Sequence, residues 1–142
     1  MSTGLAVFPL GYALAAAGYA GFQLTIRTVV YPQFARVPAR AFAEYERAHQ
    51  RLVRPMVGLL FGALAVTTAG LLLEGPRPAG AGAGALLAAL LAVTAFGAVP
   101  LHGRLSRSFD PVAHRRLLRW DAVRVVIALA QVVLGVTAVL AV

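Results

Sequence analysis

The sequence predicts an all-α fold, a four-helix transmembrane bundle with up-down-up-down topology. Three observations support it: 60% of the 142 residues are hydrophobic, the mean hydropathy is +0.79, and the arginines gather between apolar segments. A soluble domain of this length cannot hide so much apolar surface in one core. One helical crossing of a hydrocarbon layer takes roughly 20 residues, so four crossings use most of the chain. We therefore expect a single domain over residues 1–142.

Four apolar segments are long enough to cross a bilayer. We expect crossings at residues 5–26, 56–73, 80–101 and 120–142. The second carries Gly58, Gly62 and Gly70 on one face, a spacing typical of a close helix-packing seam. The fourth continues a helix that begins at Asp110-Pro111, because aspartate caps a helix N-terminus and proline needs no amide partner there.

Residues 39–53, between the first two crossings, have helical spacing and two different faces. One face carries Phe42, Tyr45, His49 and Leu52, and another carries Arg40, Glu44, Arg47 and Arg51. This pattern predicts a cytoplasmic amphipathic helix that lies at the level of the lipid headgroups or covers the mouth of the bundle. Pro55 then opens the second crossing.

The net charge of +8 comes from thirteen arginines, distributed unevenly over the connections. The first connection holds Arg27, Arg36, Arg40, Arg47, Arg51 and Arg54, and the third holds Arg104, Arg107, Arg115, Arg116, Arg119 and Arg124. Only Arg77 lies in the second. This asymmetry predicts a multi-pass protein of the plasma (inner) membrane, with the arginine-rich connections cytoplasmic and both termini outside. The arginines would contact anionic lipids and not nucleic acid.

Polar side chains within a crossing are costly in hydrocarbon and are therefore candidates for function. One stripe of the first helix carries Tyr12, Tyr19, Gln23 and Arg27, and one stripe of the fourth carries His114, Asp121, Arg124 and Gln131. We expect the two stripes to face each other across a half-polar cavity open to the cytoplasm, with His49 across its entrance. The candidate catalytic residues are His49, Asp121 and Arg124, and the candidate substrate-binding residues are Tyr12, Tyr19, Gln23, Arg27, Tyr45 and Gln131.

Structural roles are the alternative for several of these residues. Gln131 would form an interhelical hydrogen bond, and Asp121 and Arg124 would neutralise each other at i and i+3. His102 and His114 lie in a basic connection, where we expect solvated surface histidines.

Cofactor chemistry has weak support. The chain has no cysteine and no glycine-rich phosphate loop, so we expect no cofactor. Glu46 and His49 have the Glu-x-x-His spacing of di-iron bundles, but only one copy is present. A single metal ion held by Glu46, His49 and His114 is the alternative.

The stretch from Gly11 to Val57, GYALAAAGYAGFQLTIRTVVYPQFARVPARAFAEYERAHQRLVRPMV, resembles the opening half of the anthrone oxygenase-like family of small four-helix membrane proteins. The shared pattern is a glycine-bearing first helix, a proline soon after it, an amphipathic segment with Phe, Tyr and histidine or polar residues, and another proline before the second helix. The resemblance implies oxygenation of a polycyclic aromatic metabolite without metal or flavin, through the substrate's own enolate. It implies His49 as the base, with Tyr19, Gln23, Arg124 or Gln131 orienting or stabilising the anion.

Three function classes remain open at this point. The first is a site for a flat, lipophilic molecule, polycyclic aromatic or quinone-like, with oxygenase or isomerase chemistry. The second is a non-enzymatic membrane subunit that forms homo-oligomers through its small-residue seams. The third is a transporter, which would need several copies of so short a chain.

Overall fold

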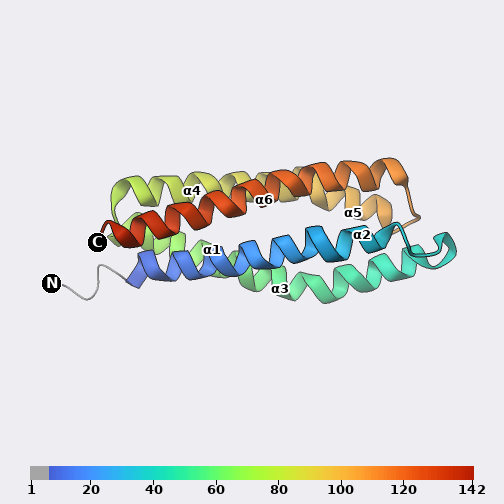
Figure 1. Cartoon of the computed structure of the whole chain (residues 1–142), viewed down its shortest axis with the longest axis horizontal. Helices are drawn as coiled ribbons and strands as arrows, with labels where there is room; N and C mark the ends of the chain where they lie inside the picture. The colour runs from blue at the N-terminus through green and yellow to red at the C-terminus, as the bar shows by residue number, and fades with distance from the viewer. Residues whose placement is uncertain (1–6) are drawn as a thin grey trace.

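The computed structural model describes residues 7–142, all helices and short connections (Figure 1). The helices are α1 (Val7–Thr25), η1 (Ile26–Val30), α2 (Tyr31–Phe34), α3 (Ala39–Glu74), α4 (Arg77–Ala92), η2 (Val93–Ala98), α5 (Val99–Leu105) and α6 (Pro111–Leu140). Within the described range no strand occurs, so the all-α prediction is confirmed. The first residues of the predicted crossing 5–26 lie outside the described part.

These elements form four rods, because η1 and η2 are π-helical turns within longer helices. The first rod joins α1, η1 and α2, the second is α3, the third joins α4, η2 and α5, and the fourth is α6. Residues 75 and 76 connect α3 to α4 at the same end as the C-terminus, and the other two connections lie at the opposite end (Figure 1).

The second rod differs from the sequence prediction at Pro55. A separate amphipathic helix over 39–53 and a crossing over 56–73 were expected, but α3 continues unbroken from Ala39 to Glu74. Proline inside a helix lacks one backbone hydrogen bond and costs about 3 kcal/mol. Its fixed φ is nevertheless helical, so the packing of the turns on both sides can hold the helix together.

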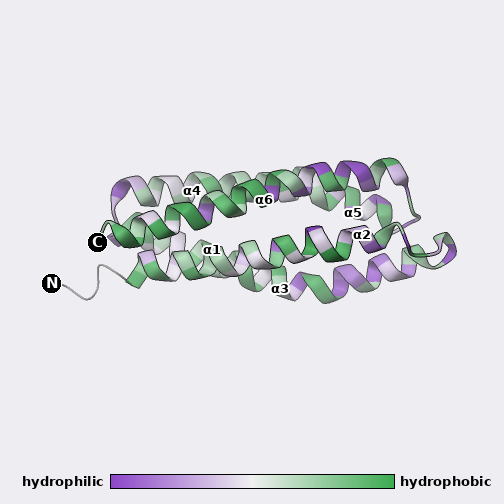
Figure 2. Cartoon of the chain, viewed as in Figure 1, coloured by the Kyte–Doolittle hydropathy of each residue, from purple (hydrophilic) through white to green (hydrophobic). Residues whose placement is uncertain are grey.

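Three of the rods are long and apolar enough to cross a membrane: Ala39–Glu74, Arg77–Leu105 and Pro111–Leu140. They suggest a membrane protein. The hydrophilic residues gather toward the end that holds the connections after α2 and α5 (Figure 2). Large apolar side chains, including Leu59, Leu73, Phe96 and Val126, are exposed on the outside of the rods. Such an outer surface suits lipid better than water.

Two clusters of buried residues hold the rods together. One is built around Tyr12, Tyr19, Leu64, Leu71 and Leu90, and the other around Tyr31, Phe34, Phe42, Leu105 and Leu117. The second cluster contains Tyr31 and Phe34 of α2 together with residues of α5 and α6.

The predicted seam of Gly58, Gly62 and Gly70 is divided in the structure. A Cβ at Gly70 would overlap the ring of Phe8, so this glycine packs α3 against α1. A Cβ at Gly58 or Gly62 would meet nothing within 4 Å, and both glycines are exposed. The seam is therefore a helix contact at one end and an open surface at the other.

The predicted start of the last helix is confirmed. Asp110 Oδ1 accepts hydrogen bonds from the backbone N–H of Val112 at 2.8 Å and of Ala113 at 3.1 Å. These bonds satisfy two of the amides that every helix N-terminus leaves free. They fix the beginning of α6, and with it the positions of Asp121 and Arg124, about three and four turns later.

Candidate functional site

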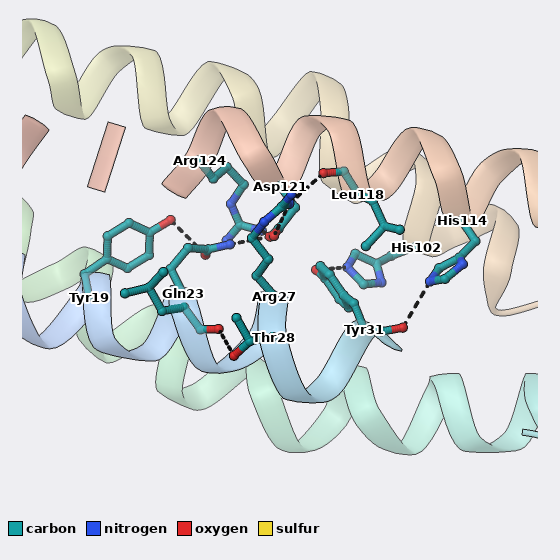
Figure 3. Close-up of polar contacts among 11 residues, drawn as sticks. Tyr19, Gln23, Arg27, Thr28, Tyr31, His102, His114, Leu118, Asp121 and Arg124 are labelled. Carbon is teal, nitrogen blue, oxygen red and sulfur yellow. Dashed lines mark hydrogen bonds and ion pairs between the residues drawn. The ribbon is translucent and has the colours of Figure 1, made fainter. Parts of the chain in front are cut away.

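A polar cluster joins the first and fourth rods around the carboxylate of Asp121 (Figure 3). The Tyr19 hydroxyl donates to Gln23 Oε1 at 3.1 Å, and Gln23 Nε2 donates in turn to Asp121 Oδ1. All three side chains are buried. Because a buried carboxylate is costly without partners, this chain of donors is what allows Asp121 to lie inside the bundle.

Two guanidinium groups complete the surroundings of Asp121. Arg27 Nη1 donates to the Leu118 carbonyl at 2.9 Å and to Asp121 Oδ2 at 3.4 Å. Arg124 Nη1 lies 4.0 Å from Asp121 Oδ1. One carboxylate thus faces two cations, which leaves the cluster with a net positive charge. The Arg124 Nε is buried and has no hydrogen-bond partner among residues 7–142.

A second polar cluster links α2, α3 and α5. The Tyr31 hydroxyl lies 3.1 Å from His102 Nε2, and His102 Nδ1 lies 2.6 Å from Glu46 Oε1. The Glu46 side chain is 0% exposed. Gln50 Nε2 donates to the same Glu46 oxygen at 3.1 Å and to the His102 carbonyl at 3.2 Å. The Tyr31, His102 and Glu46 side chains therefore form one continuous hydrogen-bonded chain.

His49 lies beside this chain and is held by aromatic contacts. Its ring packs edge-on against Phe34, with centroids 5.2 Å apart, and is stacked with the His102 ring at 6.0 Å. Within the described residues the imidazole of His49 forms no hydrogen bond.

A cavity of about 530 Å³ lies between the four rods and touches both polar clusters. Its apolar lining comes from Phe22, Ile26, Val53, Val57, Gly58, Ala98 and Val99. Its polar lining comes from Gln23, Tyr31, His49, Gln50, Arg54, Thr94, His102 and Arg124. The Thr94 Oγ1, like the Arg124 Nε, is buried without a hydrogen-bond partner in the described part of the chain. Both π-helical turns border the cavity, and such turns occur frequently at functional sites.

The predicted site residues divide into three groups in the structure. His49, Gln23 and Arg124 line the cavity. Tyr19, Arg27 and Asp121 lie behind them and bond to Gln23 or to each other. Tyr12, Tyr45 and Gln131 do not line it: Tyr12 and Gln131 are buried between rods, and Tyr45 packs on Phe34 with centroids 5.7 Å apart. The two stripes do face each other, but they bond directly and the cavity lies to one side.

The expectation of solvated histidines in the third connection is wrong. His114 is 8% exposed and its Nε2 lies 3.1 Å from the Tyr31 carbonyl oxygen, while His102 pairs with the buried Glu46. The reason is that α5 and the first turns of α6 pack against α2 and α3, so this connection is not free in solvent. Sequence reasoning missed Tyr31 and His102; the only signal was that His102 directly follows an apolar segment.

The metal alternative of Glu46, His49 and His114 is not assembled. No group of three or more His, Cys, Asp or Glu residues in the described range is arranged to hold a metal ion. Glu46 instead contacts His102, and His114 contacts a backbone carbonyl.

The chain matches no protein-family model, no curated protein and no solved structure.

Proposed function

We propose that the chain is a plasma-membrane protein that crosses the bilayer four times in up-down-up-down order, with both termini outside. The three apolar rods and the position of the connections support this topology. The arginine-rich connections after α2 and α5 lie at one end, where the hydrophilic residues gather (Figure 2). That end would face the cytoplasm. The first turns of α3, which carry Arg40, Arg47 and Arg51, would lie at the headgroups of anionic lipids.

The cavity, in this proposal, binds a flat lipophilic molecule with one polar end. Its volume of about 530 Å³ falls within the usual range for small-molecule sites, roughly 300–1,000 Å³. Seven of its lining residues are apolar, which suits a polycyclic aromatic or quinone-like body. The unpartnered Arg124 Nε and Thr94 Oγ1 suit a carbonyl or anionic oxygen at the polar end. Donors without protein partners are costly unless a ligand or water satisfies them.

The reaction we propose is removal of a proton from a carbon acid that is conjugated to a carbonyl group. His49 takes the proton as the C–H bond breaks, and the electron pair moves onto the carbonyl oxygen. Arg124 stabilises the resulting enolate, as a positioned donor does for any developing oxyanion. Dioxygen then oxidises the enolate; for anthrone the balance is anthrone plus O2 to anthraquinone plus water. The observation that carries this proposal is that Arg124 and His49, whose imidazole forms no hydrogen bond among the described residues, line the same cavity.

The test uses the full chain in lipid nanodiscs with anthrone as the probe. We expect anthrone-dependent dioxygen uptake and anthraquinone formation by the wild type. His49→Ala should lower kcat by about 10²-fold or more, the usual contribution of a general base. Arg124→Lys keeps a cation beside Asp121 but removes the Nε–H, so it should lower kcat while preserving the fold.

Arg51→Ala and Arg119→Ala are the matched controls, because both side chains are exposed on the same two helices. They should leave turnover unchanged. A wild type that neither binds nor oxidises anthrone would contradict the proposal, and so would full activity in both His49→Ala and Arg124→Lys.

A second function, assembly with further copies of the chain, is favoured by the open end of the glycine seam. Gly58 and Gly62 are one turn apart on α3, exposed and free of internal contacts. Small residues at this spacing let two transmembrane helices approach closely.

Gly62→Leu tests assembly separately from catalysis, because Gly62 does not line the cavity whereas Gly58 does. If the chain is a scaffold, Gly62→Leu should reduce the oligomer measured by mass photometry in nanodiscs, and His49→Ala should be silent. A wild type that is strictly monomeric in both detergent and lipid would remove this function.

A further inference from the structure

The Tyr31–His102–Glu46 chain has the order of a proton relay that ends at the cavity. Tyr31 and His102 line the cavity, and Glu46 lies behind them with its side chain fully buried. The three residues come from α2, α5 and α3, so only the folded bundle brings them together. His49 belongs to the same wall, with its ring centroid 6.5 Å from that of Tyr31.

The order of the hydrogen bonds in the chain follows from its distances. The Glu46 carboxylate accepts from His102 Nδ1–H at 2.6 Å, so His102 Nε2 is the nitrogen that faces Tyr31. With a neutral imidazole, the Tyr31 hydroxyl donates to Nε2. With an imidazolium, Nε2–H donates to the Tyr31 oxygen, and the phenolic proton is free to point into the cavity.

The Tyr31 phenol suits a donor that stays protonated until a substrate binds. Burial raises the pKa of Tyr31 above its usual range. The hydroxyl therefore keeps its proton at neutral pH. Transfer becomes favourable only when a negative charge develops on an oxygen close to the hydroxyl and His102 can replace the lost proton.

We propose that Tyr31 is a catalytic acid, positioned by His102 and Glu46, and that with His49 it makes the site a keto–enol tautomerase for lipophilic aromatic ketones. This inference rests on the proposed function and extends it to a second proton transfer. His49 takes the proton of the breaking C–H bond, whose electrons form the C=C bond. The carbonyl oxygen takes the Tyr31 proton, and His102 Nε2–H returns a proton to the phenolate. The proton on His49 then returns to His102 through solvent, so no net proton is gained or lost.

The experiment measures exchange of the C10 hydrogens of anthrone with D2O, without dioxygen, by NMR on the full chain in nanodiscs. Absence of dioxygen separates tautomerisation from oxidation. Tyr31→Phe, which removes only the hydroxyl, should lower kcat for exchange about 10²-fold with KM unchanged. Glu46→Gln keeps the shape of its partner but removes the charge, so it should give a smaller loss of kcat. Thr28→Val removes an exposed hydroxyl one turn away and should have no effect.

Chemical rescue separates a catalytic role of the Tyr31–His102–Glu46 chain from a purely structural one. If the role is catalytic, His102→Ala should lose exchange activity and regain part of it when imidazole is added, whereas Tyr31→Phe should not respond to imidazole. Full kcat in Tyr31→Phe in an active protein would overturn this inference alone. The inference would also be overturned if every variant that loses kcat also has a lower melting temperature and imidazole does not rescue His102→Ala. A wild type that exchanges no anthrone hydrogen would overturn this inference and the proposed function together.

Discussion

Asp121 shows how a single charged residue is accommodated within a bundle of apolar helices. Its carboxylate accepts from Gln23 and Arg27 and lies 4.0 Å from the Arg124 guanidinium. Removing one partner of a buried ion pair leaves the other charge uncompensated, at a cost of about 3–5 kcal/mol. Asp121 therefore holds Arg124 in place, and we assign it a positioning role and not direct contact with a substrate.

Asp110 should make the stability of the protein depend on pH. The backbone N–H of Ala113, with that of Val112 and the nearby Arg104, lowers the pKa of Asp110 below its ordinary value of 3.8. A carboxylate whose pKa is lower in the folded state stabilises the fold fully above the unfolded pKa, and this contribution is lost as pH falls through the folded pKa.

Asp110→Asn isolates this contribution, because asparagine also caps a helix but does not titrate. The difference in melting temperature between wild type and Asp110→Asn should be constant from pH 7 to about pH 5 and should shrink below pH 4. Thermal unfolding in detergent at a series of pH values measures it. A difference that does not change with pH would show that the charge of Asp110 contributes nothing.

Helix packing at the scale of elements depends on where glycines meet a neighbouring backbone. A Cβ at Gly135 on α6 would lie 2.7 Å from Cα of Ala13 on α1. This contact is with backbone, so no side-chain rotation can relieve it. It brings α1 and α6 close enough for the Gln23–Asp121 hydrogen bond to form.

Gly135→Ala should therefore destabilise the protein, by about 1–3 kcal/mol as for other overpacked sites. Gly21→Ala is the control, because a Cβ there meets nothing within 4 Å and alanine favours helix over glycine by about 1 kcal/mol. Titration with SDS in mixed micelles measures the free energy of unfolding of both variants. A neutral Gly135→Ala would mean that α1 and α6 are farther apart than the structure has them.

The orientation of the whole molecule in the membrane can be tested by labelling its connections. The chain has no cysteine, so single-cysteine variants report one position each. Arg77 lies at the start of α4, and Arg107 lies in the connection between α5 and α6. In intact cells a membrane-impermeant maleimide should label Arg77→Cys, and Arg107→Cys should react only after permeabilisation. Labelling of Arg107→Cys alone in intact cells would invert the proposed topology and place the open end of the cavity outside.

The sequence by itself determined the helical class, the N-cap at Asp110 and the placement of the polar residues on two helical stripes. These depend on local composition and on the 3.6-residue period, which are properties of neighbouring residues in the chain. The unbroken α3 was not predicted, because the cost of Pro55 is visible in the sequence and the packing that offsets it is not. The membrane topology of the chain and the chemistry of the site stay predictions.

Only the tertiary structure decided which polar residues share the cavity. Tyr31, Glu46 and His102 come from three rods and have no common spacing in the sequence. Their contact depends on the angles and distances at which the rods pack, and these are set by many side chains acting together. The same packing buries His114 and partly buries His102, both of which the charge pattern placed in solvent.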